Sequence, residues 1–196
     1  MTIILSVIAI LTAVLVPTVM SHITQARILR ARQDVRTIAD AVTRLYLDMG
    51  IVPKTRDSIG GGTGSDAFRV LVSGGNGPVA SASSHGTTDW ETTDIDFLGN
   101  HLMNNVPGYR LKGADSGLGW NGPYLAASPE ADPWGNRYMI NIEYLDTTTG
   151  ALDADGAIKL AVFVISAGQD GVVDTAYGQP LTDVSIGGDD IAHRLQ

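Results

Sequence analysis

The residues of this chain best suited to chemistry are aspartates interleaved with glycines near the C-terminus. Asp170 lies in the run SAGQDG at residues 166–171, Asp174 follows it, and a second run, GGDD, ends at Asp190. Glycines permit sharp turns that leave carboxylates and backbone carbonyls facing inward, an arrangement suited to Ca²⁺, which takes about six to eight oxygen ligands. The alternative interpretation is that Asp and Gly here mark only a surface loop.

A second informative segment precedes this one, with GPYL at residues 122–125 and DPWGNRY at residues 132–138. Asp-Pro and Gly-Asn pairs are typical of a rigid turn, and the rings of Trp134 and Tyr138 are suited to anchor such a turn by burial. We therefore expect a structural turn made by Asp132, Pro133, Trp134, Gly135 and Asn136.

No catalytic motif is recognised in the sequence. The run GLGWNG at residues 117–122 matches the dinucleotide pattern GxGxxG as a string, but no predicted strand precedes it and Pro123 follows where a helix should begin. A nucleophile elbow, a P-loop and paired acids in an apolar setting are all missing. The histidines lack metal-ligand spacing and are expected at the surface or at helix ends: His22, His85, His101 and His193. The sequence thus predicts a protein that is not an enzyme.

The element that must carry these segments is a long N-terminal helix. Residues 1–20 have no charged side chain, and a helix of that length spans about 30 Å, the thickness of a bilayer's hydrocarbon core. A secretory signal peptide is the alternative, but it would need a basic n-region and a small-residue cleavage site. We expect residues 1–20 to be a transmembrane or filament-core segment that begins a helical stem at residues 1–49.

Beyond Pro17 the stem is predicted to continue as an amphipathic helix. Its apolar positions alternate in steps of three and four, which places them on one stripe: Ile28, Ala31, Val35, Ile38, Val42, Leu45 and Met49. Gly50 fits a helix C-cap, and Pro53 prevents the helix from continuing. We expect the stripe to pack against a sheet.

Residues 50–196 are predicted to form one globular head, and the expected fold class is α+β. Residues 50–107 are rich in Gly, Ser, Thr and Asn, which indicates a variable, loop-rich region with short elements at residues 67–72 and 93–104. Residues 108–196 are predicted to hold an antiparallel sheet and the C-terminal Asp/Gly loop. The clearest strands, rich in β-branched and aromatic residues, are at residues 137–145 and 158–166.

Composition narrows the possible partners. The 196 residues include no cysteine, which excludes disulfides and thiolate metal sites. The formal net charge of −8 is uneven, because the stem carries more Arg than Asp while the head is strongly acidic. An acidic head disfavours nucleic acid as a partner. A basic stem beneath it would let neighbouring copies attract each other, although a solvated helix face explains the arginines equally well.

Together these features resemble the type IV pilin superfamily, and the C-terminal half is most similar to the major pseudopilin of type II secretion systems. The matching features are the apolar helix with its proline, the helix exit LYLDMGIVPKT at residues 45–55, and the runs GPYL, DPWGNRY and SAGQDG. The resemblance covers about residues 1–55 and 120–190. It implies the pilin fold, a long N-terminal helix packed on a small antiparallel sheet, and assembly into a helical filament.

The resemblance also implies roles for individual residues. Stems of neighbouring subunits are expected to pack through Ile4, Ile8, Leu11, Leu15 and Pro17. In the pseudopilin family a C-terminal loop binds Ca²⁺, which here implies ligands among Asp170, Asp174, Asp189 and Asp190 together with backbone oxygens near Ser166 and Gly168. The spacer between Asp170 and Asp189 is longer than the family pattern suggests.

The chain departs from the family at its start. Pilins carry a basic leader that is removed before a segment whose fifth residue is Glu, whereas position five here is Leu5. Aligning Pro17 with the stem proline of the family places Met1 about five residues into a mature chain. We expect the leader and the first mature residues to be missing from this sequence; the alternative is that Met1 is the mature terminus and the Glu contact is lost.

Two hypotheses for function follow. The first is a structural filament subunit, either a pilin or a major pseudopilin. It is held in the inner membrane by a single pass with the head outside the cytoplasm, and the pilus or secretion machinery then assembles it into a periplasmic or extracellular filament. Surface pilus and protein-secretion pseudopilus stay undecided. The second is a membrane-anchored monomeric periplasmic enzyme or Ca²⁺-dependent binding module.

Overall fold

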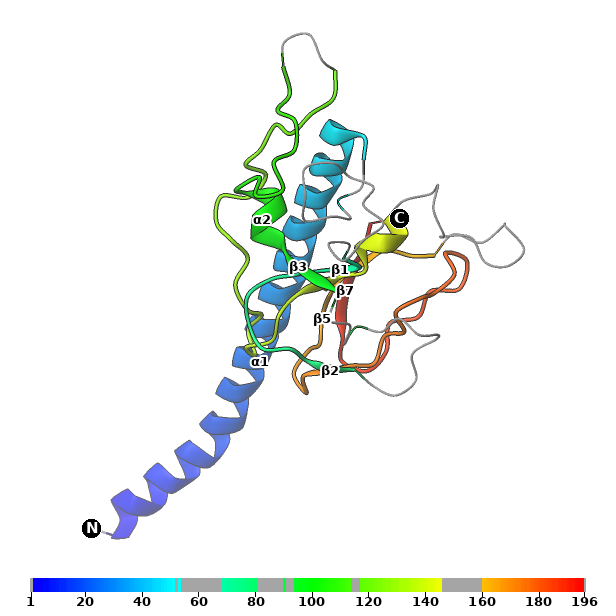
Figure 1. The fold of residues 1–196 in the computed structure, drawn as a ribbon. Helices are drawn as coiled ribbons and strands as arrows, with labels where there is room; N and C mark the ends of the chain where they lie inside the picture. The colour runs from blue at the N-terminus through cyan, green and yellow to red at the C-terminus, as the bar shows by residue number, and fades with distance from the viewer. Residues whose placement is uncertain are drawn as a thin grey trace.

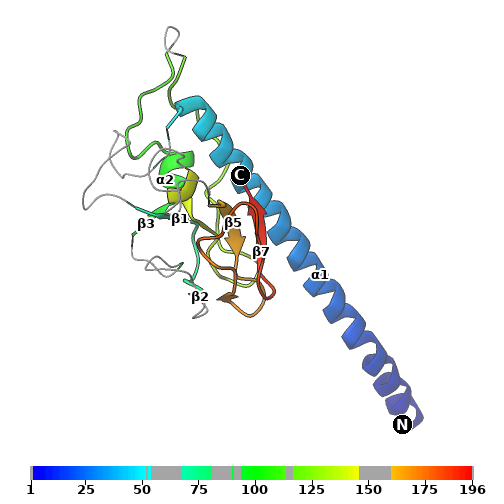
Figure 2. The same cartoon turned by 90° about the vertical axis from the view of Figure 1, so that its right-hand side faces the viewer.

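The dominant element is one long helix. The computed structural model describes residues 2–51, 53, 68–80, 90, 94–113, 117–145 and 160–195. Helix α1 (Thr2–Met49) is a single helix, and Pro17 lies inside it without ending it. Its N-terminal half projects away from the head, and its C-terminal half lies along one side of the head (Figures 1 and 2). The predicted long stem helix is confirmed.

The apolar stripe of α1 packs on the head. Ala31, Val35, Val42 and Leu45 are completely or almost completely buried in the main core. The helix ends where Gly50 takes a φ of 66° and donates its N–H to Tyr46 O at 2.8 Å. A left-handed residue of this kind closes the last turn with little strain only when it is glycine. The predicted C-cap is therefore correct.

Helix α1 covers a small mixed sheet. The strands, in spatial order, are β3 (Ile95–Phe97), β1 (Val70–Val72), β4 (Met139–Ile140), β5 (Phe163–Ser166) and β7 (Ile191–Arg194). Three of the four pairings are antiparallel, as predicted, but β1 and β3 are parallel. The long connection at residues 73–94 lets the chain return to the starting end of β1, which a parallel pair requires. The fold is an α+β, pilin-like arrangement.

Several predicted elements are shorter than the sequence pattern suggests. Residues 93–104 contain β3 followed by the short helix α2 (Leu98–Leu102). In residues 137–145 only β4 is a strand, and the 3₁₀ turn η1 (Ile142–Leu145) follows it. The reason is Asn141 between them, whose buried side-chain amide donates to Ala161 O and Tyr177 O at 2.9 Å and accepts from Phe163 N at 2.8 Å. Residues 146–159, which include the start of the second predicted strand, lie outside the described residues, and β5 alone forms in the described part of that strand.

The sheet has an apolar core on each face. The main core lies between the sheet and α1. A smaller core on the opposite face contains Trp90 and Tyr177, whose rings meet edge to face, and Trp90 Nε1 donates to Thr175 O at 2.8 Å. A separate two-stranded pairing, β2 (Val79–Ala80) with β6 (Val172–Val173), lies at the end of the head nearer the N-terminus of α1 (Figures 1 and 2).

Candidate functional site

The first candidate surface is the projecting half of α1. Its predicted filament-core side chains are exposed: Ile4 by 66%, Ile8 by 55%, Leu11 by 64% and Leu15 by 63%, and Pro17 is exposed as well. The four large residues recur at steps of four and three, so they form one row along the helix. Among the described residues, no helix meets the length and apolarity that crossing a membrane requires.

The second candidate is the turn at residues 132–136. The buried Asp132 organises it, because Asp132 Oδ1 accepts from the N–H groups of Trp134 and Asn136, each at 2.9 Å. Gly135 donates its N–H to Asp132 O at 3.0 Å and has a φ of 98°, a conformation that favours glycine. This is a carboxylate-capped turn of the Asx kind.

The turn supports the beginning of the Asp/Gly loop. Ser166, buried at the end of β5, donates its hydroxyl to Asp132 Oδ2 at 2.6 Å and accepts from Gly168 N at 3.3 Å. The side chain of Asn136 lies against Gly171, where an added Cβ would approach Asn136 Nδ2 to 3.2 Å. The two motifs noted separately in the sequence therefore form one connected network.

Within the Asp/Gly loop, Asp189 and Asp170 shape a turn at residues 168–171. Asp189 Oδ2 accepts from Gln169 N at 2.6 Å and from Asp170 N at 3.3 Å. The carboxylate of Asp170 accepts from Val172 N at 2.8 Å and is exposed. Gly168 packs so closely on Asp189 that no side chain fits there. These two aspartates cap the backbone of the turn.

Asp190 and Asp174 form the other pair. Asp190 Oδ2 accepts three hydrogen bonds, from Asp174 N at 2.9 Å, Thr175 N at 2.7 Å and Thr175 Oγ1 at 2.6 Å. Burial raises the pKa of Asp190 to about 6; the charge of Asp174 acts in the same direction, and the hydrogen bonds oppose it. Gly188, with a φ of 49°, packs directly on the carboxylate of Asp174.

The four predicted calcium ligands thus fall into two pairs. In the part of the chain that the structure describes, no three His, Cys, Asp or Glu side chains come close enough together to hold a metal. Asp190 Oδ1 is nevertheless buried and has no hydrogen-bond partner among the described residues. A buried carboxylate oxygen without a donor is costly unless a cation meets it. Asp190 with Asp174 therefore fits a hard cation better than the turn at residues 168–171 does.

One buried polar network was not predicted. His101 is fully buried, so it does not lie at the surface; it occupies the last turn of α2, which agrees with the expectation of a helix end. Its Nε2 lies 3.1 Å from Asp96 Oδ2, and its Nδ1 makes a hydrogen bond with the Tyr109 hydroxyl. Burial opposes ionisation of Asp96, but its hydrogen bonds, led by that with His101, outweigh burial and lower its pKa. The five-residue spacing of Asp96 and His101 across the start of α2 was the available signal.

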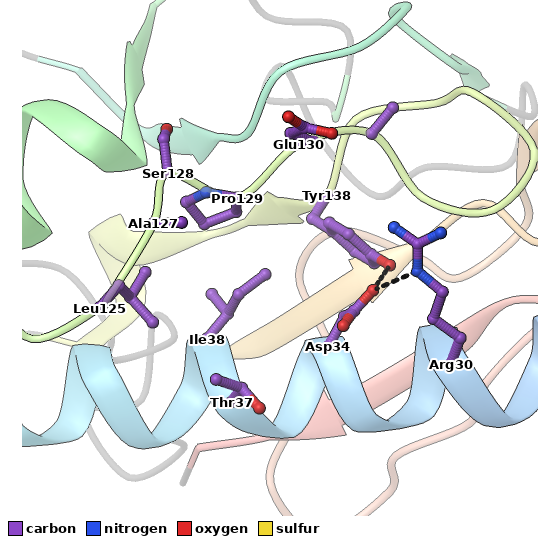
Figure 3. A pocket seen from close by; sticks show the side chains of 11 residues that line it. Arg30, Asp34, Thr37, Ile38, Leu125, Ala127, Ser128, Pro129, Glu130 and Tyr138 are labelled. Atoms are coloured by element: carbon purple, nitrogen blue, oxygen red, sulfur yellow. Dashed lines mark hydrogen bonds and ion pairs between the residues drawn. The ribbon is translucent and has the colours of Figure 1, made fainter.

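A groove runs between α1 and the segment at residues 125–131 (Figure 3). Its volume is about 290 Å³, and its apolar walls come from Ile38, Leu125, Ala127, Pro129 and Ala131. At one end the Tyr138 hydroxyl donates to Asp34 Oδ2 at 2.8 Å, and Arg30 Nε lies 3.6 Å from the same oxygen. The exposed carboxylate of Glu130 stands at the rim and has no ion-pair partner among the described residues. The side chains of Asp34, Tyr138 and Arg30 therefore form one end of the groove, and Glu130 lies at the rim of the same end.

The chain was compared with models of known protein families, with curated proteins and with solved structures. None of the three comparisons found a match. The description of the fold as pilin-like therefore rests only on the arrangement of its elements, in which α1 packs on a mixed five-stranded sheet.

Proposed function

We propose that this chain is a structural subunit of a type IV pilus-like helical filament, assembled through the projecting half of α1. The observation that carries the proposal is the row of four large side chains on that half, each more than half exposed. A contiguous apolar surface of this kind on a protein in water marks a contact with another protein or with lipid. The pilin-like fold supports a second copy as the protein that covers it.

An inner-membrane stage before assembly belongs to the proposal, with the head outside the cytoplasm and the finished filament periplasmic or extracellular. It is supported by the absence of charged side chains in residues 1–20. It has no support from a membrane-spanning helix, because none is found among the described residues. The subunit would then move from lipid to filament with little change in apolar burial, so helix packing and head contacts must drive the transfer.

The filament proposal is tested with Ile8→Asp in the full chain. A buried, unpaired charge between packed stems costs several kcal/mol, so filaments should be lost while the head keeps its melting temperature. The matched control is Gln33→Asp, which places the same charge at an exposed position of α1 outside both the apolar row and the groove between α1 and residues 125–131. Filaments are counted by negative-stain electron microscopy after removal of detergent, and the head is monitored by thermal unfolding.

Two results would contradict the proposal. Filaments of normal length from Ile8→Asp would show that the row is not in a filament core. Dispersed single particles from the unsubstituted chain, under every condition tried, would favour the monomeric membrane-anchored enzyme or Ca²⁺-dependent binding module instead.

A calcium ion in the Asp/Gly loop is the second part of the proposal. Asp190 and Asp174 would hold it with backbone oxygens of residues near them, and the ion would neutralise the buried carboxylate of Asp190, whose Oδ1 has no donor among the described residues. Its role would be structural, because it would tie the segment around Asp174 to the chain entering β7. Asp170 and Asp189 would preserve the adjoining turn.

The calcium proposal predicts that chelation lowers the melting temperature of the head. Saturation at about a hundred times the dissociation constant adds about 2.7 kcal/mol, which corresponds to about 5–10 °C for a domain of this size. Asp190→Asn should abolish the shift, whereas Asp183→Asn, at an exposed aspartate outside both pairs, should retain it. An equal calcium shift in Asp190→Asn would exclude Asp190 as a ligand.

A further inference from the structure

The end of the head farthest from the N-terminus of α1 carries a projecting loop. Its described parts, residues 103–113 and 117–121, form two arms that reach past the C-terminal end of α1 in both views of the fold (Figures 1 and 2). The loop is tied to α1 by Gly119 N, which donates to Asp48 O at 2.7 Å, and by Lys112 Nζ, which lies 2.8 Å from Asp48 Oδ1. It is therefore held on the helix.

This loop presents an apolar side chain beside a positive charge. Leu111 is 63% exposed, although its backbone is held in a bridge with Trp120. The neighbouring Arg110 is exposed, and its guanidinium has no ion-pair partner among the described residues. Arginine is enriched at protein–protein interfaces relative to the rest of the surface, and the fully buried centre of an interface is more apolar than its rim.

The groove of Figure 3 offers the complementary features on the stem side of the same head. It lies beside residues 30–38 of α1, has apolar walls, and is larger than a leucine side chain. Glu130 at its rim is exposed and lacks an ion-pair partner among the described residues. The loop thus offers a leucine and an arginine, while the groove offers an apolar cavity and a glutamate.

We infer that this groove receives the projecting loop of a second copy, with Leu111 in the groove and Arg110 beside Glu130. The inference rests on the proposed filament function and names the head contact within it. The two surfaces differ and lie toward opposite ends of the head, so the contact is heterologous. Such a contact repeats from copy to copy and builds an open filament.

The chain offers a direct test because it has no cysteine. Leu111→Cys and Ala127→Cys together place one thiol on the loop and one in the groove wall. If the loop of each copy sits in the groove of the next, oxidation of assembled filaments should give a ladder of dimers, trimers and longer covalent chains. Disulfides form only where Cβ atoms approach to about 3.5–4.5 Å.

Three controls define the result. Each single-cysteine variant should give no species larger than a dimer, and Leu111→Cys combined with Asp183→Cys should not form a ladder. Asp183 lies in the turn at residues 180–183, outside the groove. The same double variant kept dispersed in detergent should stay monomeric on oxidation.

A charge exchange gives an independent readout. Arg110→Glu and Glu130→Arg should each raise the concentration of unassembled protein about tenfold, because each places like charges together at the contact. The chain with both changes should return to within about threefold of the unsubstituted protein. Arg110→Glu with Asp183→Arg makes the same charge changes and should stay impaired.

The outcomes separate this inference from the proposed function. Filaments that give no ladder, or a charge exchange that does not restore assembly while the heads stay folded, would overturn the loop-in-groove contact and leave the filament function standing. Absence of filaments from the unsubstituted chain would overturn both.

Discussion

The carboxylate of Asp132 allows the sharpest test of how the head is held together. It is 4% exposed and accepts three hydrogen bonds, from Trp134 N, Asn136 N and Ser166 Oγ. Asp132→Ala removes all three hydrogen bonds at once. Trp134 and Asn136 are partly exposed, so we expect water to reach their amides, but Ser166 is fully buried.

The expected cost follows from these contacts. A hydrogen bond to a charged group contributes about 1.5–3 kcal/mol, and a buried donor left without a partner costs about 1–3 kcal/mol. Because water recovers part of the loss at the turn, we expect Asp132→Ala to lower the free energy of unfolding by about 3–5 kcal/mol. For a domain of this size that is a fall in melting temperature of about 6–20 °C.

The assay is urea unfolding of the full chain in detergent, monitored by tryptophan fluorescence. Asp132→Asn should cost less, because its side-chain oxygen still accepts from Trp134 N and Asn136 N. Ser166→Ala should remove the link between Asp132 and β5 together with the longer hydrogen bond from Gly168 N. In a double-mutant cycle, Asp132→Ala and Ser166→Ala should be coupled by about 0.5–3 kcal/mol. A loss below about 1 kcal/mol for Asp132→Ala, or strict additivity with Ser166→Ala, would refute the network.

Two further predictions concern acid stability and the glycines of the loop. The pKa of Asp96 is lowered in the folded state, so its ionised form stabilises the fold above its unfolded pKa of about 4, and that contribution is lost as the pH falls through the lower folded value. Asp96→Asn should therefore flatten the fall in urea midpoint below about pH 4, and an unchanged pH profile would contradict this. Gly188→Ala should lower the melting temperature and weaken any calcium response, because its Cβ collides with the carboxylate of Asp174 at a φ of 49°. Gly117→Ala, where a Cβ meets nothing within 4 Å, is the matched control and should be neutral.

The sequence predicted those parts of the structure whose causes are local. The alternation of apolar residues indicated which face of α1 is buried, and Gly50 with Pro53 indicated where the helix ends. Both depend on contacts within about one helical turn. The strand predictions were less accurate, because β4 is cut short by Asn141, whose partners at residues 161, 163 and 177 are distant in sequence.

The local sequence pattern also did not predict the parallel pairing of β1 with β3 or the burial of His101. A strand pattern does not specify the direction of its neighbour, so the parallel pairing of β3 with β1 depends on the route of the connecting chain. His101 resembles any histidine of a polar loop until the fold places Asp96 and Tyr109 on its two nitrogens. Burial of an imidazole is decided by the partners that tertiary structure supplies.

By itself the sequence determined the stem, the α+β class and the two C-terminal segments in which polar chemistry is concentrated. Only the tertiary structure decided how those segments work together. It joined Asp132 to Ser166 across 34 positions, and it divided the four aspartates into a turn-capping pair and a pair with a buried oxygen that has no partner among the described residues. The physical reason is that helix periodicity and turn composition act between near neighbours, whereas hydrogen bonds between buried side chains depend on where distant strands bring the chain together.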